Sequence, residues 1–150
     1  MNKINSIDQF LSCKNIAVVG VSSKGNGFGV AVYKHLKNAG YNVFGVNKNG
    51  GKTDDEMLFH SLSNIPSKVD AVVTVIPPFE TEKIIDEMIK LSINQVWMQQ
   101  GSESELAKEK CISNGINVIF GECILMFAEP VKSIHSFHRW INKIIGKYPD

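Results

Sequence analysis

The sequence predicts an α/β protein built on an open parallel sheet of about five strands, with helices on both faces. The first observation is that short apolar runs alternate with amphipathic helical patterns about five times along the 150 residues. The second is that the connections are short, and right-handed crossovers of this kind place successive strands in one parallel sheet. We therefore expect residues 1–150 to form a single domain, which is ordinary for a chain of this length.

The expected strands are apolar runs rich in β-branched residues. The run DAVVTVI is apolar almost throughout, which is typical of a parallel strand buried on both faces. Gly20, Asn47 and the Pro77-Pro78 pair close the first three runs. The expected strands span residues 15–20, 42–46, 70–76, 95–98 and 117–120.

The expected helices follow the 3.6-residue apolar period and begin at capping residues. Asn5 or Ser6 caps the first helix, and Ser102 with Glu105 forms a capping box before a helix that Gly115 ends. The helices are expected over 5–12, over 28–39, from about 79, from 102, and over 133–145, where the last one packs on the domain. The residues expected to face the core are Ile7, Phe10 and Leu11; Val32, Leu36 and Ala39; Ile84, Ile85, Met88 and Leu91; Leu106, Cys111 and Ile112; and Ile134, Phe137, Ile141 and Ile144.

The segments between these elements are polar. Lys48 to Thr53 is expected to be a flexible loop, and residues 59–66 a short helical turn and a connector. The acidic run Asp54-Asp55-Glu56 suits a cap or a solvated surface better than a metal site. We expect His35 to be solvated, and His60 has no visible partner in the sequence.

Composition and charge exclude several classes of function. The net charge of +1 gives no overall attraction to nucleic acid or to an anionic membrane, and no apolar run is long enough to cross a bilayer. The first residues, MNKINSIDQF, lack the apolar core of a signal peptide. Cys13, Cys111 and Cys123 are odd in number and widely spaced, which argues against a disulfide framework and for the reducing cytoplasm.

The segment between the first strand and the first long helix has the layout of a phosphate-binding turn. Its glycine spacing is Gly20-x-Ser22-x-x-Gly25, a dinucleotide fingerprint with serine in place of the second glycine. Backbone N–H groups of such a turn and the positive end of the helix dipole converge where an anion can bind. A purely structural role remains open, because any strand-to-helix turn favours glycine and serine.

The end of the second expected strand distinguishes between nucleotide classes. NAD-binding folds place an acidic residue there to bind the ribose hydroxyls, whereas this chain has Asn47 followed by Lys48. A neutral residue followed by a cation suits a phosphorylated ribose, which both NADP and coenzyme A carry. Lys24, Lys48 and Lys52 lie in loops that could reach such a phosphate, and a solvated surface role for each stays open.

Four tight turns are expected at the same edge of the sheet, because each follows the carboxyl end of a strand. In open α/β sheets this edge is where ligands bind. The turns are Gly20 to Gly27, Val46 to Gly51, Ile76 to Phe79, and Gln99 to Ser102.

The sequence shows no catalytic constellation: no serine lies in a nucleophile elbow, and no strand-end loop pairs histidine with a carboxylate. Two alternatives to a plain binding module stay open. One is a minimal NADP-linked oxidoreductase, although little chain is left to hold a second substrate. The other is a thiol or metal sensor using Cys123 with His135 and His138, although their spacing matches no standard zinc site. Ile124 to Phe127 and Trp140 suit a homodimer contact or, more commonly, the core.

The chain resembles the small stand-alone coenzyme A-binding proteins, which are similar to the N-terminal Rossmann-type domain of the succinyl-CoA synthetase α subunit. The resemblance covers about residues 15–125 and rests on a set of motifs rather than one. The stretches that carry it are IAVVGVSSKGNGFGVAVYKHLKNAGYNVFGVN and FHSLSNIPSKVDAVVTVIPPFETEKIIDEMIKLSINQVWMQQGS. It implies a Rossmann-like fold that binds coenzyme A or acyl-CoA. It does not imply ligase activity, because the catalytic histidine of the synthetase lies in a part of that enzyme that the resemblance does not cover.

The resemblance also implies a role for each strand-end loop. The first would meet the phosphates, the second the adenosine, the third the ribose and the pantetheine arm, and the fourth would complete the mouth. Lys48 and Asn49 stand where the family often has proline, which either alters the second loop or supplies a cation for the 3′-phosphate. The expected ligand-binding residues are Gly20, Ser22, Ser23, Lys24, Phe28, Gly29, Val46, Asn47, Lys48, Ile76, Pro77, Pro78, Gln100 and Gly101.

Overall fold

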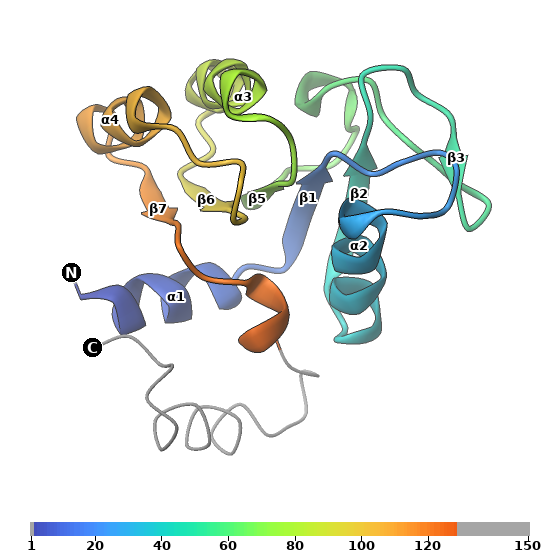
Figure 1. Cartoon of the computed structure of the whole chain (residues 1–150), viewed down its shortest axis with the longest axis horizontal. Helices are drawn as coiled ribbons and strands as arrows, with labels where there is room; N and C mark the ends of the chain where they lie inside the picture. The colour runs from blue at the N-terminus through green and yellow to red at the C-terminus, as the bar shows by residue number, and fades with distance from the viewer. Residues whose placement is uncertain (1, 129–150) are drawn as a thin grey trace.

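The computed structural model describes residues 2–128. Five parallel strands form one sheet in the order β2-β1-β5-β6-β7, which confirms the expected Rossmann-like α/β fold (Figure 1). Strand β2, which follows β1 in the chain, pairs with one edge of β1, and β5 pairs with the other edge. The strands are β1 (Asn15–Val19), β2 (Asn42–Val46), β5 (Ala71–Thr74), β6 (Gln95–Met98) and β7 (Asn117–Ile119).

Within the described part of the chain, four helices cover the two faces of this sheet. Helices α1 and α2 lie on one face and α3 and α4 on the other, and each pair contributes to a separate apolar cluster (Figure 1). The helices are α1 (Lys3–Leu11), α2 (Phe28–Asn38), α3 (Pro78–Leu91) and α4 (Glu105–Ser113), with single 3₁₀ turns at η1 (Leu62–Asn64) and η2 (Ile124–Met126).

The core on the α1–α2 face is organised around Trp97. This side chain is fully buried, and its ring meets Phe10 edge-on with centroids 5.4 Å apart. Its Nε1–H donates to the carbonyl of Glu122 at 2.8 Å, so the polar atom of the indole is satisfied inside the core. Ile124 and Phe127 are buried in the same cluster, and therefore serve the core rather than a homodimer contact.

Two of the expected helix caps are wrong. Asn2 caps α1, since its Oδ1 accepts from the backbone N–H of Asn5 at 2.9 Å. Ser104, not Ser102, caps α4. Ser102 is buried instead and donates to the carbonyl of Thr74 at 3.0 Å, because the turn after β6 extends two residues further than the capping-box pattern implied.

Some side-chain orientations also differ from expectation. Leu91, Leu106 and Ile112 are exposed because α3 and α4 present Ile85, Met88, Ala107 and Cys111 to the sheet instead. His35 is half-buried rather than solvated, and its Nε2–H donates to the carbonyl of Ala128 at 2.6 Å. The helix expected over 133–145 lies outside the described residues.

The polar segment after β2 is folded rather than a flexible loop. It contains a hairpin of β3 (Lys52–Thr53) and β4 (Glu56–Met57), whose turn residues Asp54 and Asp55 have φ of 48° and 63°. Ion pairs from Lys34 to Asp54, at 3.7 Å, and from Lys37 to Glu56 join this hairpin to α2.

Beyond the hairpin, the chain returns along the outer edge of β2. The backbone N–H of Phe59 donates to the carbonyl of Gly45 at 2.9 Å, and the N–H of Asn47 donates back to the carbonyl of Phe59 at 2.9 Å. These bonds place residues 58–60 beside the carboxyl end of β2.

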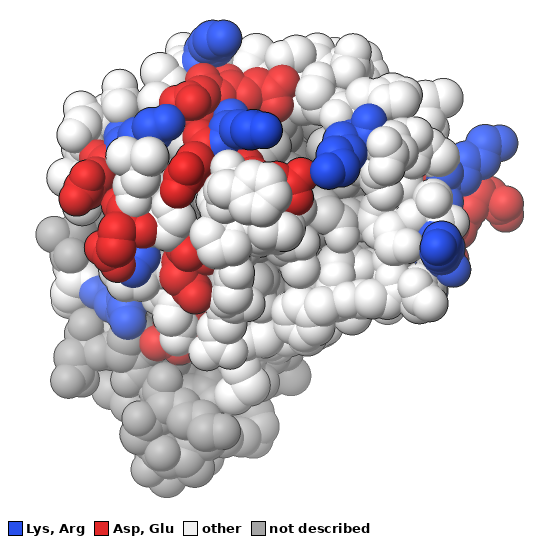
Figure 2. Space-filling model, turned by 45° about the horizontal axis from the view of Figure 1, so that its top comes forward, with Lys and Arg blue, Asp and Glu red and all other residues white. Residues whose placement is uncertain are grey.

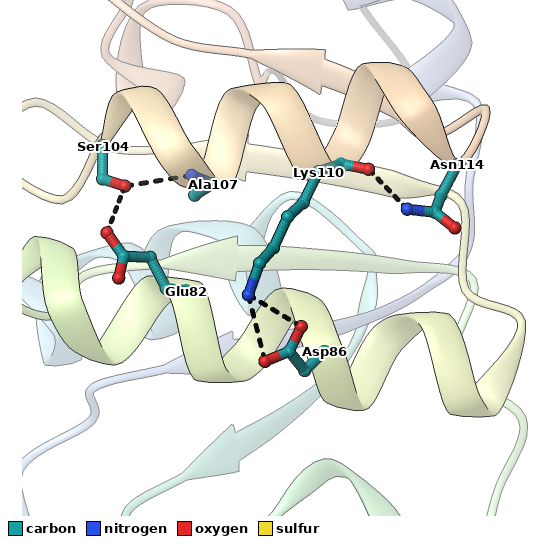
Figure 3. Close-up of polar contacts among 6 residues, drawn as sticks. All are labelled: Glu82, Asp86, Ser104, Ala107, Lys110 and Asn114. Carbon is teal, nitrogen blue, oxygen red and sulfur yellow. Dashed lines mark hydrogen bonds and ion pairs between the residues drawn. The ribbon is translucent and has the colours of Figure 1, made fainter.

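Polar contacts between α3 and α4 position the second helix pair (Figure 3). Ser104 Oγ accepts from the N–H of Ala107 at 3.0 Å and donates to Glu82 Oε2 at 2.6 Å. Further along the two helices, Lys110 Nζ lies 2.9 Å from Asp86 Oδ1. The Ser104 hydroxyl thus both caps α4 and ties it to α3.

We predict that Ser104→Ala lowers the free energy of unfolding by about 1–2 kcal/mol, because it removes an N-cap and leaves the carboxylate of Glu82 without this donor. Urea unfolding followed by circular dichroism measures the loss. Ser113→Ala, an exposed serine in the same helix, is the matched control and should change stability by less than about 0.5 kcal/mol. Equal losses in the two variants would contradict the double role of Ser104.

Candidate functional site

The carboxyl ends of β1 and β5 flank the point where the sheet reverses its direction of winding. A cleft of about 570 Å³ opens there, between the loop after β2 and the start of α3. Open α/β sheets bind ligands at this switch point because the loops diverge and leave a crevice. The cleft is lined by Val19, Gly20, Ser22, Val46, Asn47, Lys48, Asn49, His60, Ile76, Phe79, Glu80, Lys83 and Ile84.

The first wall of the cleft is the turn from β1 into α2, which is held by close backbone contacts. Gly20 has φ +110°, and a Cβ there would lie 2.2 Å from the carbonyl oxygen of Val75. A Cβ on Gly29 would lie 2.0 Å from the carbonyl oxygen of Gly20. Gly29 therefore provides the close helix–strand packing, whereas Gly25 has open space around it and only its φ of +77° favours glycine.

Ser22 organises the same turn through its hydroxyl. Ser22 Oγ accepts from the backbone N–H of Lys24 at 3.0 Å, a serine turn that directs the chain toward α2. Gly27 occupies the N-cap position of α2 and offers no side-chain acceptor. The N–H groups of the first turn of α2 consequently keep their capacity to bind an anion. The expected site residues Ser23, Lys24, Phe28 and Gly29 belong to this turn but do not line the cleft.

The second wall follows β2 and is held by the side chain of Asn47. Its Nδ2–H donates to the carbonyl of Val21 at 2.9 Å, and its Oδ1 accepts from the N–H of Asn49 at 2.8 Å. Both ends of the amide are thus engaged in joining the loop after β2 to the loop after β1. Asn47 lines the cleft, but its polar atoms already have protein partners.

The third wall is the first two turns of α3. Pro77 is its N-cap and Pro78 its first residue, and neither lines the cleft, although both were expected to. The wall consists of Ile76 before them and of the helix face formed by Phe79, Glu80, Lys83 and Ile84 after them. Phe79 is 61% exposed, so its ring stands at the rim.

The charged groups of the cleft converge from two of these walls. Lys48 Nζ lies 3.1 Å from Glu80 Oε1, which connects the loop after β2 with the first turn of α3. Lys83 forms no ion pair within residues 2–128. His60 Nδ1 is 3.1 Å from the carbonyl of Lys48; because a carbonyl only accepts, this nitrogen carries the proton. Figure 2 shows charges of both signs interspersed on the visible face, with acidic groups gathered on the side of α3 and α4.

The fourth expected loop does not reach the cleft. Gln100 and Gly101 are exposed and absent from its lining. The neighbouring Gln99 is buried, with its Oε1 accepting from the N–H of Ile124 at 2.7 Å and its Nε2 lying 3.6 Å from Cys123 Sγ. This loop therefore fastens the end of β6 to the segment after β7.

The thiol and metal alternatives concern Cys123 together with two histidines of the last segment, and of these only Cys123 is among the described residues. Cys13, Cys111 and Cys123 are free thiols, and burial raises the pKa of Cys111 to about 12. Across residues 2–128, no three His, Cys, Asp or Glu side chains are grouped closely enough to hold a metal ion. His135 and His138 lie outside the described residues.

Sequence reasoning missed the helix face that forms the third wall. Asn49 and Phe79 lie in turns expected at this edge but were not named as ligand-binding residues. The lining residues missing from the expected set are Val19, Asn49, His60, Phe79, Glu80, Lys83 and Ile84. A residue three or four positions further along a helix lies on the same face. This spacing relates Phe79 and Glu80 to Lys83 and Ile84, so the sequence did contain a signal for one shared face of α3. We interpreted Ile84 as a core residue and the charged positions as solvated, because nothing in the pattern showed that this face turns toward β2.

The profile of the CoA binding domain family matches residues 14–129. The chain belongs to this family. The match covers every strand of the sheet and all residues that line the cleft. Among the described residues of this CoA-binding domain protein, no helix is both long enough and apolar enough to span a membrane.

Curated relatives and solved structures agree with this assignment. The chain is 27% identical over 110 residues to the α subunit of ADP-forming acetate–CoA ligase I of Pyrococcus furiosus, a match that covers 69% of this chain but only 24% of that subunit. It is 28% identical over 115 residues to protein YneT of Bacillus subtilis, covering 74% of this chain and 82% of that protein. A solved structure of a hypothetical protein from Pyrococcus horikoshii superposes with a TM-score of 0.76 at 27% identity, covering 81% of this chain and 86% of the other.

We predict that Gly29→Ala lowers the free energy of unfolding by more than about 2 kcal/mol, because the new Cβ would meet the carbonyl oxygen of Gly20. Helix propensity alone predicts the opposite sign, a gain of about 1 kcal/mol. Chemical denaturation measures the difference. Ala31→Gly, at an exposed position of the same helix, is the control and should lose about 1 kcal/mol. A Gly29→Ala protein as stable as the parent would show that the turn does not depend on this contact.

Proposed function

We propose that this CoA-binding domain protein binds coenzyme A or an acyl-CoA in the cleft at the carboxyl edge of β1, β2 and β5, and that it carries no catalysis of its own. The observation that supports the proposal most strongly is the coincidence of three features at the switch point. They are a strand-to-helix turn of phosphate-binding layout without a side-chain cap, lysines on the two other walls, and apolar lining residues such as Val46 and Ile76.

The chemistry of the cleft fits each part of this ligand. The turn from Gly20 to Gly27 and the first N–H groups of α2 suit the diphosphate, since no side chain caps these N–H groups. Lys48 follows β2, where nucleotide-binding folds hold the ribose, and suits the 3′-phosphate. Val46 and Ile76 provide apolar surface for the adenine or the pantetheine arm.

The groups that face the cleft support a binding role without catalysis. Within the described residues, its titratable side chains are Lys48, His60, Glu80 and Lys83. The hydrogen bond of His60 goes to a backbone carbonyl, and Glu80 pairs with Lys48, so neither is joined to a nucleophile. Ser22 supplies a hydroxyl group to the cleft, and its oxygen accepts from a backbone N–H rather than facing a base.

The compartment and partners follow from the same features. The three thiols Cys13, Cys111 and Cys123 are free, which favours the reducing cytoplasm. The mixed surface charges and the net charge of +1 favour a small anionic ligand over nucleic acid or membrane as the partner.

We predict that isothermal titration gives a dissociation constant at least about tenfold lower for coenzyme A than for NADP. Because Asn47 stands where NAD-binding folds have an acidic residue, the site tolerates the phosphorylated ribose of either ligand. Only coenzyme A has a pantetheine arm, which gains affinity by packing on the apolar lining of the cleft. Raising the salt concentration should weaken binding, because lysines meet phosphates. Tighter binding of NADP would reject coenzyme A as the ligand.

We also predict that Ser22→Asp weakens coenzyme A binding by more than about 100-fold, because it places a carboxylate beside the diphosphate. The matched control is Ser22→Asn. Both side chains can accept the N–H of Lys24 as the serine does, so both preserve the turn, and only the first adds charge. We expect the asparagine variant to bind within about fivefold of the parent. Equal affinity of the two variants would locate the diphosphate elsewhere.

A further inference from the structure

We propose that Glu80 sets the preference of the cleft between ligands with and without a phosphate on the adenosine ribose, by competing with that phosphate for Lys48. The inference rests on the proposed function and concerns a residue that the sequence did not single out. Its starting point is the ion pair between Lys48 Nζ and Glu80 Oε1 at 3.1 Å, both of whose members line the cleft.

The two partners of this ion pair differ in how firmly they are held. The Glu80 side chain is only 22% exposed and lies in the first turn of α3, where the positive end of the helix dipole stabilises a carboxylate. The Lys48 side chain is 74% exposed and extends from a loop. Lys48 is therefore the partner that can move, and Glu80 is the partner that stays.

The position of Lys48 determines which phosphate it can serve. It comes two residues after the last residue of β2, where nucleotide-binding folds recognise the ribose substituents. Lys83, the other lysine of the cleft, extends from α3 and forms no ion pair within residues 2–128. A phosphate on the ribose would therefore bind Lys48, whose charge is already neutralised by Glu80. The diphosphate does not depend on Lys48.

Binding of a 3′-phosphorylated ligand consequently has a cost that a ligand with a free 3′-hydroxyl avoids. Lys48 must leave Glu80 to meet the phosphate, and the carboxylate then remains nearby as a like charge. With a free hydroxyl the ion pair stays intact. Glu80 thereby narrows the difference in affinity between the two ligands.

The test compares coenzyme A with dephospho-coenzyme A, which lacks only the 3′-phosphate, by isothermal titration at low ionic strength. We expect Glu80→Gln to bind coenzyme A about three- to fivefold more tightly than the parent, with the affinity for dephospho-coenzyme A unchanged. Glu109→Gln is the matched control. It removes the same charge from an exposed position on α4, outside the cleft, and should alter neither affinity.

A second variant checks that the effect acts through Lys48. Lys48→Met removes the charge from a side chain of similar length and should weaken coenzyme A binding. Glu80→Gln added to Lys48→Met should then recover less affinity than it adds to the parent, because the competition for Lys48 is gone and only the like-charge repulsion is relieved.

The outcomes separate this inference from the proposed function. If Glu80→Gln tightens both ligands equally, or changes neither, the inference is overturned while coenzyme A binding stands. If folded parent and variant proteins bind neither ligand, the proposed function falls and this inference falls with it. A selective gain for coenzyme A that depends on Lys48 supports both.

Discussion

The structure depends on a pair of close backbone contacts, where the turn after β1 passes between the end of β5 and the start of α2. Gly20 lies against the carbonyl of Val75, and Gly29 lies against the carbonyl of Gly20. No side chain fits at either position, so the helix begins directly beside the strand ends. These contacts direct the first turn of α2 to the switch point of the sheet and leave space there for a ligand.

The sheet could be predicted from the sequence because its signal is local. Each strand is an apolar run, and a run such as DAVVTVI is distinctive without knowledge of its neighbours. Features that depend on tertiary contacts were missed. Ser104, which caps α4, also donates to Glu82 of another helix. The hairpin is held through Asp54 and Glu56 by lysines of α2, and a local pattern contains neither partner.

The candidate site likewise contains a part that the sequence predicted and a part that it did not. Topology alone placed four loops at one edge, and Gly20, Ser22, Val46, Asn47, Lys48 and Ile76 do line the cleft. The fourth loop is diverted because Gln99 and Ser102 are bonded within the fold. The face of α3 was missed because the angle of a helix over a sheet follows from packing, which no periodicity encodes.

The strand order leaves β2 at one border of the sheet, where unpaired backbone groups would invite another chain to add on. The returning segment at Phe59 occupies the carboxyl half of that border through its bonds with Gly45 and Asn47. The segment that shields the strand from self-association also brings His60, the next residue, into the lining of the cleft. A single stretch of chain therefore serves both ligand recognition and solubility. A change in this stretch that weakened its bonds to β2 in order to alter ligand binding would also expose the strand edge to aggregation.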